Sequence, residues 1–210
     1  MKSLGHALLA AFGLALTCPA ASVTIDGAGL RELRGGVSGT AAPAGSKVLL
    51  GYFLGLTDDQ IVSRQADTEF LESRFIPFGS GGAVGQGTGG AAGYFTFVTS
   101  ANVEMPTRDF TMPTAPNTDR MYVWAFDSSG SAQQATFQTI FTSSSPEWRF
   151  PVTDDGTSDR TISTDDSFSM LVGRSTSDAV YLAHIPEPRS LTAIVLAGAW
   201  LLGRRQSRKR

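Results

Sequence analysis

Histidine and cysteine, which often act as nucleophiles, general bases or zinc ligands, are scarce in this 210-residue chain. The only cysteine is Cys18, and the two histidines are His6 and His184. Cys18 and His6 lie in a segment that is predicted to be a cleaved leader. His184 stands just before a Pro-Glu-Pro motif, where we expect nothing to hold it rigid. A Ser-His-Asp triad, a Cys-His pair or a histidine-rich zinc site is therefore not expected. We assign no catalytic residue and expect no enzyme.

Carboxylates could still hydrolyse a glycosidic bond, because that reaction needs only two acids at a set separation. Glu147 is the first candidate for a general acid, since the apolar neighbour Trp148 could raise its pKa. A Glu-Trp pair is also an ordinary feature of a strand end, and we favour that structural interpretation. The other glutamate candidates are Glu32, Glu69, Glu72 and Glu104.

An acidic stretch at residues 154–159 (DDGTSD) offers oxygen ligands around a glycine, as calcium loops do. Its carboxylates are Asp154, Asp155 and Asp159, and the pair Asp165 and Asp166 follows closely. The stretch lacks the alternating acids and the closing glutamate of an EF-hand loop. We therefore favour a solvated acidic turn, keep Asp154, Asp155 and Asp159 as weak metal candidates only, and expect no metal or cofactor.

Residues 79–93 (GSGGAVGQGTGGAAG) are the most glycine-dense part of the chain, and Gly85, Gly87 and Gly90 satisfy G-x-G-x-x-G. A dinucleotide site needs this motif between a strand and a helix, and neither flank fits that context. The chain also has no Gly-Lys-Ser/Thr sequence, so a phosphate-binding loop of the P-loop type is not expected. The segment is predicted to be a flexible surface loop between strands.

The first 22 residues have the order of a secretory signal peptide. A basic start at Lys2 precedes an apolar run over residues 7–16, and small residues follow at Ala20, Ala21 and Ser22. Cleavage after any of these three is compatible with the pattern. The single cysteine would leave with the leader, so the exported body contains no disulfide.

The predicted exported body, residues 23–184, is long enough for one domain and is acidic. Of the 19 acidic and 17 basic residues in the chain, the body keeps all but Glu187 and seven basic residues. It therefore has 18 acidic and 10 basic residues and a net charge near -8. Such a surface repels nucleic acids, which are not expected as partners. The basic residues outside the body are Lys2, Arg189, Arg204, Arg205, Arg208, Lys209 and Arg210.

The last 26 residues, 185–210, combine a proline-flanked acid, a short apolar segment and a basic tail. The apolar segment begins at Leu191 and ends at Gly203. As a helix it would span about 20 Å, whereas the hydrocarbon core of a bilayer is about 30 Å thick. The segment would therefore anchor the chain in a membrane only marginally. The basic tail would stay on the cytoplasmic side and place the body across the inner membrane. Pro186 and Pro188 are expected to keep residues 185–189 extended and open to a processing enzyme.

Pro186, Glu187 and Pro188, the apolar segment and the arginines at 204 and 205 resemble the PEP-CTERM sorting signal of Gram-negative bacteria. The resemblance implies recognition by an exosortase, a membrane cysteine transpeptidase that cuts near the Pro-Glu-Pro motif. The cargo would then be released or attached to the cell surface or to exopolysaccharide. A softer likeness to uncharacterised cargo proteins of this kind covers "KVLLGYFLG" and "MYVWAFD" and implies no activity.

The body has the composition of a β-rich domain. Residues 120–127 (RMYVWAFD) are apolar on both faces, which predicts a central strand, and a turn at residues 127–131 predicts a hairpin with the next strand. If exposed, Tyr122, Trp124 and Phe126 could stack on sugars, but core packing is favoured. Thr57 to Gln60 fits a capping box and predicts a short helix over residues 58–65, resumed near 67–73. The other predicted strands are residues 47–54, 94–98, 135–142, 148–152, 168–172 and 179–184.

These features predict a mainly β protein, with a single β-sandwich-like domain and a short helical insertion between the signal peptide and the sorting helix. The expected function is that of an exported cell-envelope or extracellular-matrix protein whose partners are an exosortase, the inner membrane transiently, and exopolysaccharide. The alternative is a carbohydrate-binding module or polysaccharide-active enzyme delivered by the same signal.

Overall fold

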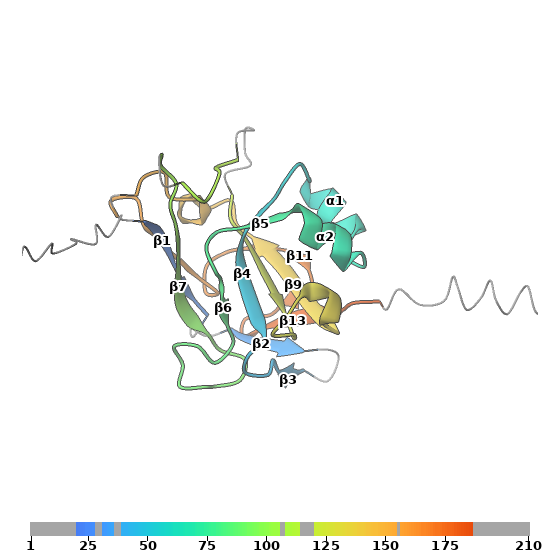
Figure 1. Cartoon of the computed structure of the whole chain (residues 1–210). Coiled ribbons are helices and arrows are strands. Elements are labelled where there is room, and N and C mark those ends of the chain that lie inside the picture. The colour runs from blue at the N-terminus through green and yellow to red at the C-terminus, as the bar shows by residue number, and fades with distance from the viewer. Residues whose placement is uncertain are drawn as a thin grey trace, which may run out of the picture.

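The computed structural model describes residues 20–27, 31–35, 39–105, 108–113, 120–154 and 156–186 (Figure 1). The predicted signal peptide up to residue 19 lies outside the described residues. So do Glu187, Pro188, the predicted membrane segment 191–203 and the basic tail. The folded part is mainly β, with two sheets and few helices, as the composition predicted.

A three-stranded sheet has the order β10-β1-β7, and a ten-stranded sheet contains the path β3-β2-β13-β9-β8-β4-β5. β11, β12 and β6 pair with β9, β13 and β4 beside that path. The strands are β1 Ala21–Asp26, β2 Glu32–Gly35, β3 Thr40–Ala41, β4 Lys47–Phe53, β5 Phe75–Pro77, β6 Gly82–Ala83, β7 Thr96–Ala101, β8 Tyr122–Phe126, β9 Phe137–Thr142, β10 Arg160–Ser163, β11 Ser169–Val172, β12 Arg174–Ser175 and β13 Ala179–His184.

The centre of the large sheet is β8, which pairs antiparallel with β4 on one side and with β9 on the other. Every residue of β8 is buried, because a strand covered on both faces and both edges has no solvent-facing side. The predicted hairpin of β8 and β9 is confirmed. The carboxylate of Asp127 stabilises the turn of this hairpin, because it accepts hydrogen bonds from the backbone amides of Thr136 at 2.8 Å and Phe137 at 2.9 Å.

The helical insertion consists of α1 (Asp58–Ser63) and α2 (Thr68–Arg74), close to the predicted positions. The capping box is confirmed. The Thr57 hydroxyl accepts the Gln60 amide at 3.3 Å, and the Gln60 side chain accepts the Thr57 amide at 2.9 Å. Ile61 and Leu71 are fully buried and attach the two helices to the core.

Two short 3-10 helices, η1 (Ala132–Gln134) and η2 (Pro146–Trp148), complete the fold. The prediction of a strand over residues 148–152 is wrong at this point. Pro146 begins η2, and Arg149 makes only an isolated bridge to Arg120. Pro151 has no amide to donate to a ladder, which prevents a longer strand.

The small sheet lies along one side of the molecule, where β1 and β7 run side by side (Figure 1). β1 was not predicted as a strand, because its first two residues, Ala21 and Ser22, fall in the predicted signal peptide. Its Ala21, Val23 and Ile25 are buried, in strict alternation with more exposed residues. They belong to the same hydrophobic core cluster as the buried residues of the large sheet.

The glycine-rich segment 79–93 lies between strands at the surface, as predicted, but parts of it are hydrogen-bonded to the neighbouring strands, and residues 89–92 are exposed. The Gly85 amide donates to the Tyr94 carbonyl at 2.7 Å, and the Thr96 amide donates to the Gln86 carbonyl at 2.7 Å. A Cβ on Gly82 would lie 2.2 Å from the ring of Phe97. Glycine is needed here for close approach of the backbone, and not for freedom of motion.

Candidate functional site

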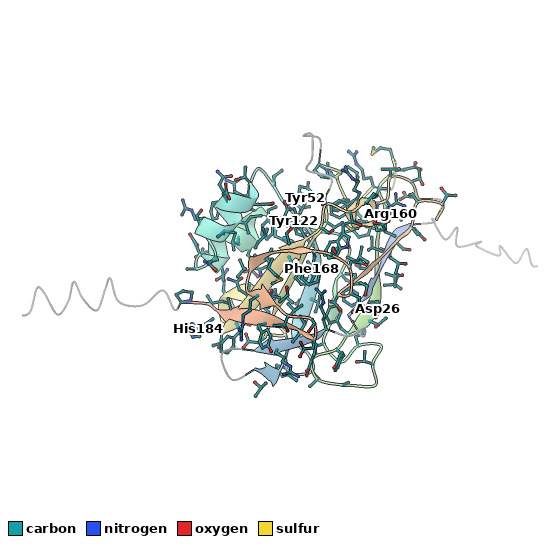
Figure 2. All side chains as sticks on the ribbon, turned by 180° about the vertical axis from the view of Figure 1, so that it is seen from behind. Asp26, Tyr52, Tyr122, Arg160, Phe168 and His184 are labelled. Carbon is teal, nitrogen blue, oxygen red and sulfur yellow. The ribbon has the colours of Figure 1, made fainter. Side chains whose placement is uncertain are left out.

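The described part of the chain ends two residues after β13, whose last residue is His184. Ile185 is 7% exposed, and its amide donates to the Thr136 carbonyl at 2.8 Å. Pro186, the first residue of the predicted sorting motif, is exposed. Figure 2 shows His184 at the edge of the body, where the ribbon of β13 ends. Glu187 and Pro188 lie outside the described residues, as do Arg204, Arg205, Arg208, Lys209 and Arg210.

Two hollows border the end of β13. The exit groove has a volume of about 630 Å³ and is lined by Gln65, Leu171, Gly173, Arg174 and Tyr181 to His184. The guanidinium of Arg174 lies 4.2 Å from the centroid of the Tyr181 ring, as a cation–π contact. A second hollow of about 330 Å³ lies between the start of α2 and η1, and Ile185 lines it. The turn between α1 and α2 therefore borders both hollows, with Gln65 lining one and Ala66 the other.

His184 is better held than the sequence suggested. Its ring packs edge-on against the ring of Phe137, with the centroids 5.4 Å apart. Its backbone pairs with Phe137 in the sheet. The structure therefore ties the last residue of the predicted body to β9.

Glu147 does not have the environment of a general acid. It is exposed in η2, whereas Trp148 beside it is buried and donates its indole N–H to Asp166 at 3.1 Å. A hydrogen bond from the Ser145 hydroxyl lowers the pKa of the Glu147 carboxyl, which is the opposite of the shift considered from the sequence. Trp148 cannot raise this pKa because it packs inward on Phe141 and Phe168.

The other glutamates are dispersed over the fold. Glu32 in β2 pairs with Arg34 at 2.8 Å. Glu72 in α2 accepts the Ala132 amide at 3.1 Å and thereby joins α2 to η1. Glu69 lines the second hollow, and Glu104 is exposed in a bend after β7.

Two of the three weak metal candidates bind backbone amides of the first strand. Asp154, 6% exposed, accepts the amide of Ala21, and Asp159 accepts the amide of Ser22. Asp155 lies outside the described residues. Within the described ranges, no group of three or more His, Cys, Asp or Glu side chains is arranged to hold a metal ion.

The aromatic residues of β8 belong to the core. Tyr122, Trp124 and Phe126 are 7%, 0% and 1% exposed, so they are not available to stack on a sugar. The preference for core packing is confirmed. The indole N–H of Trp124 donates to the side-chain oxygen of Gln138 at 3.0 Å, which satisfies its only polar atom.

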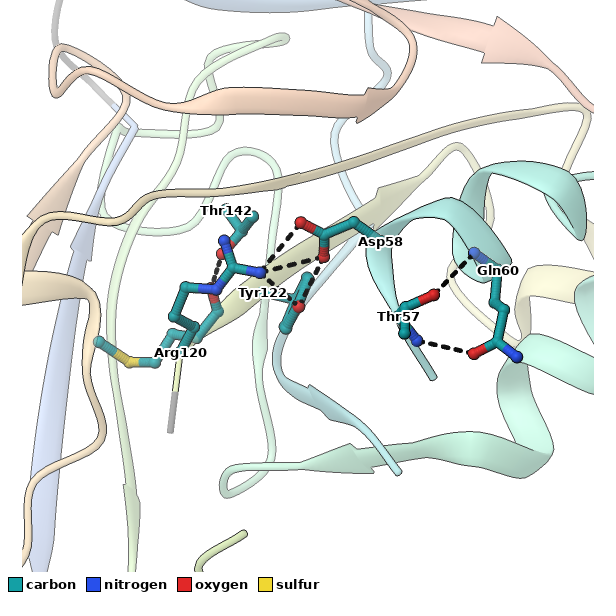
Figure 3. Close-up of polar contacts among 7 residues, drawn as sticks. Thr57, Asp58, Gln60, Arg120, Tyr122 and Thr142 are labelled. Atoms are coloured by element: carbon teal, nitrogen blue, oxygen red, sulfur yellow. Dashed lines mark hydrogen bonds and ion pairs between the residues drawn. The ribbon is translucent and has the colours of Figure 1, made fainter. Parts of the chain in front are cut away.

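Sequence reasoning missed a polar cluster that connects α1 to β8 (Figure 3). The Tyr122 hydroxyl donates to Asp58 at 2.8 Å, and Arg120 donates both to Asp58 at 3.0 Å and to the Tyr122 hydroxyl at 3.1 Å. From the sequence, Asp58 was only the first residue of the helix predicted after the capping-box threonine Thr57. No local pattern could have paired it with residues so far along the chain.

Burial, together with the hydrogen bond and charge of Asp58, raises the pKa of Tyr122 to about 12, and Arg120 lowers it by less. The unfolded chain ionises its tyrosines near pH 10. Because the folded form keeps the proton longer, we expect stability to fall as the pH rises from about 10 towards about 12. Asp58→Asn removes the neighbouring anion, so it should lower the pKa of Tyr122, measured by ultraviolet titration of tyrosinate.

Asp59→Asn is the matched control for this titration, because it removes the same charge from the same turn at an exposed position. An unchanged Tyr122 titration in Asp58→Asn would contradict the assigned contacts.

No family model, curated protein or solved structure matches this chain. In the part of the chain that the structure describes, helices are too short or too polar to cross a membrane.

Proposed function

We propose that this protein is an exported component of the cell envelope or extracellular matrix, carried there by a PEP-CTERM-like tail that an exosortase removes. In this proposal the folded part acts as one β-sandwich-like domain, residues 185–210 are a delivery signal, and the inner membrane holds the precursor transiently through residues 191–203. The expected partners are the exosortase and, after delivery, exopolysaccharide.

The observation that supports this proposal best is the change from a buried to an exposed residue at the start of the predicted motif. Ile185 is buried and hydrogen-bonded, and Pro186 beside it is exposed. A protease or transpeptidase needs an extended, accessible substrate, and two prolines with one residue between them favour that conformation. Cleavage after Pro186 would leave every residue of β13 in place.

The test is the C-terminus of the mature protein, determined by mass spectrometry after expression of the full chain in a host that has an exosortase. We expect a terminus close to Pro186, Glu187 and Pro188, and surface or extracellular location. In a variant that lacks residues 191–210 we expect loss of the surface location with an unchanged circular dichroism spectrum. Glu187→Gln tests the motif, and Glu104→Gln is a control at an exposed glutamate of the body.

Recovery of surface protein that still ends at Arg210 would contradict processing. The same protein in a host without an exosortase should accumulate as a membrane-bound precursor.

A second candidate function is a carbohydrate-binding module or polysaccharide-active enzyme with the same delivery. The exit groove favours it, because Arg174, Tyr181 and His184 offer hydrogen-bonding and aromatic groups in one hollow of ligand size. Binding to extracted matrix glycan that is lost in Tyr181→Ala would support a module, and release of reducing sugar would support an enzyme.

A further inference from the structure

We infer that the leader is cleaved between Ala20 and Ala21, and that the new α-ammonium group of Ala21 then forms a buried ion pair with Asp154. The inference rests on the proposed export. Hydrolysis of the Ala20–Ala21 peptide bond leaves a carboxylate on Ala20 and an amine on Ala21. That amine binds a proton at neutral pH, since α-amino groups have an ordinary pKa of about 8.

Asp154 is a buried carboxylate that forms no ion pair with any described residue. It is 6% exposed, and its Oδ1 accepts the amides of Val103 at 2.7 Å and Ala21 at 3.3 Å. Its Oδ2 accepts the amide of Glu104 at 3.0 Å. The three amide donors offset part of the desolvation cost of this buried carboxylate, and a cation at the Ala21 nitrogen would offset more of it.

Ala21 is in the right place to supply that cation. The residue is 0% exposed and stands opposite Ala101 at the start of β1. Ala20 before it is only partly buried. Removing Ala20 would therefore open the nitrogen to water on one side while the hydrogen bond to Asp154 stays. The ammonium would turn a long neutral hydrogen bond into a charge-assisted one.

The two other cleavage positions would damage the small sheet. Cleavage after Ala21 removes a buried core residue and one of the three donors to Asp154. Cleavage after Ser22 also removes the 2.8 Å hydrogen bond from the Ser22 amide to Asp159 and two register pairs between β1 and β7.

The sequence around the bond is compatible with this position. Leader peptidases favour small residues at the first and third positions before the cut. Cleavage after Ala20 places Ala20 and Cys18 there, whereas cleavage after Ala21 would place Pro19 at the third position. Cleavage after Ser22 also satisfies the pattern, and only the geometry of β1 and Asp154 separates the two.

The first test is the N-terminus of the full chain after export, determined by intact mass and N-terminal sequencing. We expect the mature protein to begin at Ala21. A chain that begins at Ser22 or Val23 would overturn the inference and leave the proposed export standing. Exported protein that still begins at Met1 would overturn both.

The second test measures the ion pair by the reactivity of the α-amine towards an acetylating reagent at neutral pH. Lys47, the only lysine of the body, is the internal reference. We expect the Ala21 amine of the folded protein to react about tenfold more slowly than in urea, and Asp154→Asn to remove most of that protection. Asp159→Asn, which contacts Ser22 instead, should keep it. Full reactivity of the amine in the folded wild type would overturn the ion pair, as would unchanged protection in Asp154→Asn.

Discussion

Replacing Gly87 with alanine is expected to lower the free energy of unfolding by about 3 kcal/mol, because two costs coincide at this position. Gly87 has a φ of +70°, in the left-handed region that alanine adopts only under strain. An added Cβ would also lie 2.1 Å from the carbonyl oxygen of Thr96, which is backbone at the start of β7. The segment or the strand would have to move. Urea unfolding of the purified protein, followed by circular dichroism, measures the loss.

Gly89→Ala separates the two costs. Gly89 has a φ of +67°, and apart from its chain neighbours no atom lies within 4 Å of the position that an added Cβ would take. This variant should lose about 1 kcal/mol, from backbone strain alone. Equal losses in the two variants would mean that the segment is not held against β7, and would restore the flexible loop predicted from the sequence.

Replacing Trp124 with alanine is expected to cost about 3–5 kcal/mol of stability, a large part of what a domain of this size possesses. Trp124 is fully buried at the centre of the large sheet and contacts the rings of Phe53, Phe75 and Phe126. Its removal opens a cavity and also leaves the Gln138 oxygen without its donor. Thermal and urea unfolding should both report the loss.

The variants Trp124→Phe and Gln138→Leu separate the loss of apolar contact from the loss of the hydrogen bond between Trp124 and Gln138. Phenylalanine keeps most of the apolar contact but leaves the buried Gln138 oxygen unpaired, at a cost of about 1–3 kcal/mol. Gln138 also donates to the Gln65 carbonyl, so it attaches the turn after α1 to β9. If the double variant loses less than the sum of the single variants, the hydrogen bond couples the two residues. If the stability losses of the two single variants simply add up in the double variant, the two residues are not coupled.

Local patterns predicted five of the ten strands of the large sheet, namely β4, β8, β9, β11 and β13. The apolar character of residues 47–54 and 120–127 and the turn at Asp127 gave β4, β8 and their place in the sheet, because burial on both faces is written in consecutive residues. The capping box predicted α1, because the residues that form it are also close together in the sequence. The short strands β2, β3, β5, β6 and β12 have too few residues to show a period, and they form because a neighbouring strand supplies the hydrogen bonds.

The candidate site was less predictable, because its geometry depends on pairs that are distant in sequence. The contact of Glu147 with Ser145 is local, yet the direction in which Trp148 packs depends on Phe141 and Phe168. The acidic stretch suggested metal ligands, whereas Asp154 and Asp159 bind the amides at the start of β1. Nothing near residue 154 in the sequence indicates that the partner is Ala21.

The strand order also constrains when this protein can fold. β2 is joined to the rest of the large sheet through β13, in parallel, with Leu33 opposite Val180. β1 likewise pairs in parallel with β10, where Val23 is opposite Arg160. Pairings that close such long loops form slowly and late. If the chain crosses a translocation channel from its N-terminus, as the proposed export requires, β2 can join the large sheet only after β13 has emerged. The sheet would then be completed only when the residues next to the tail have reached the far side.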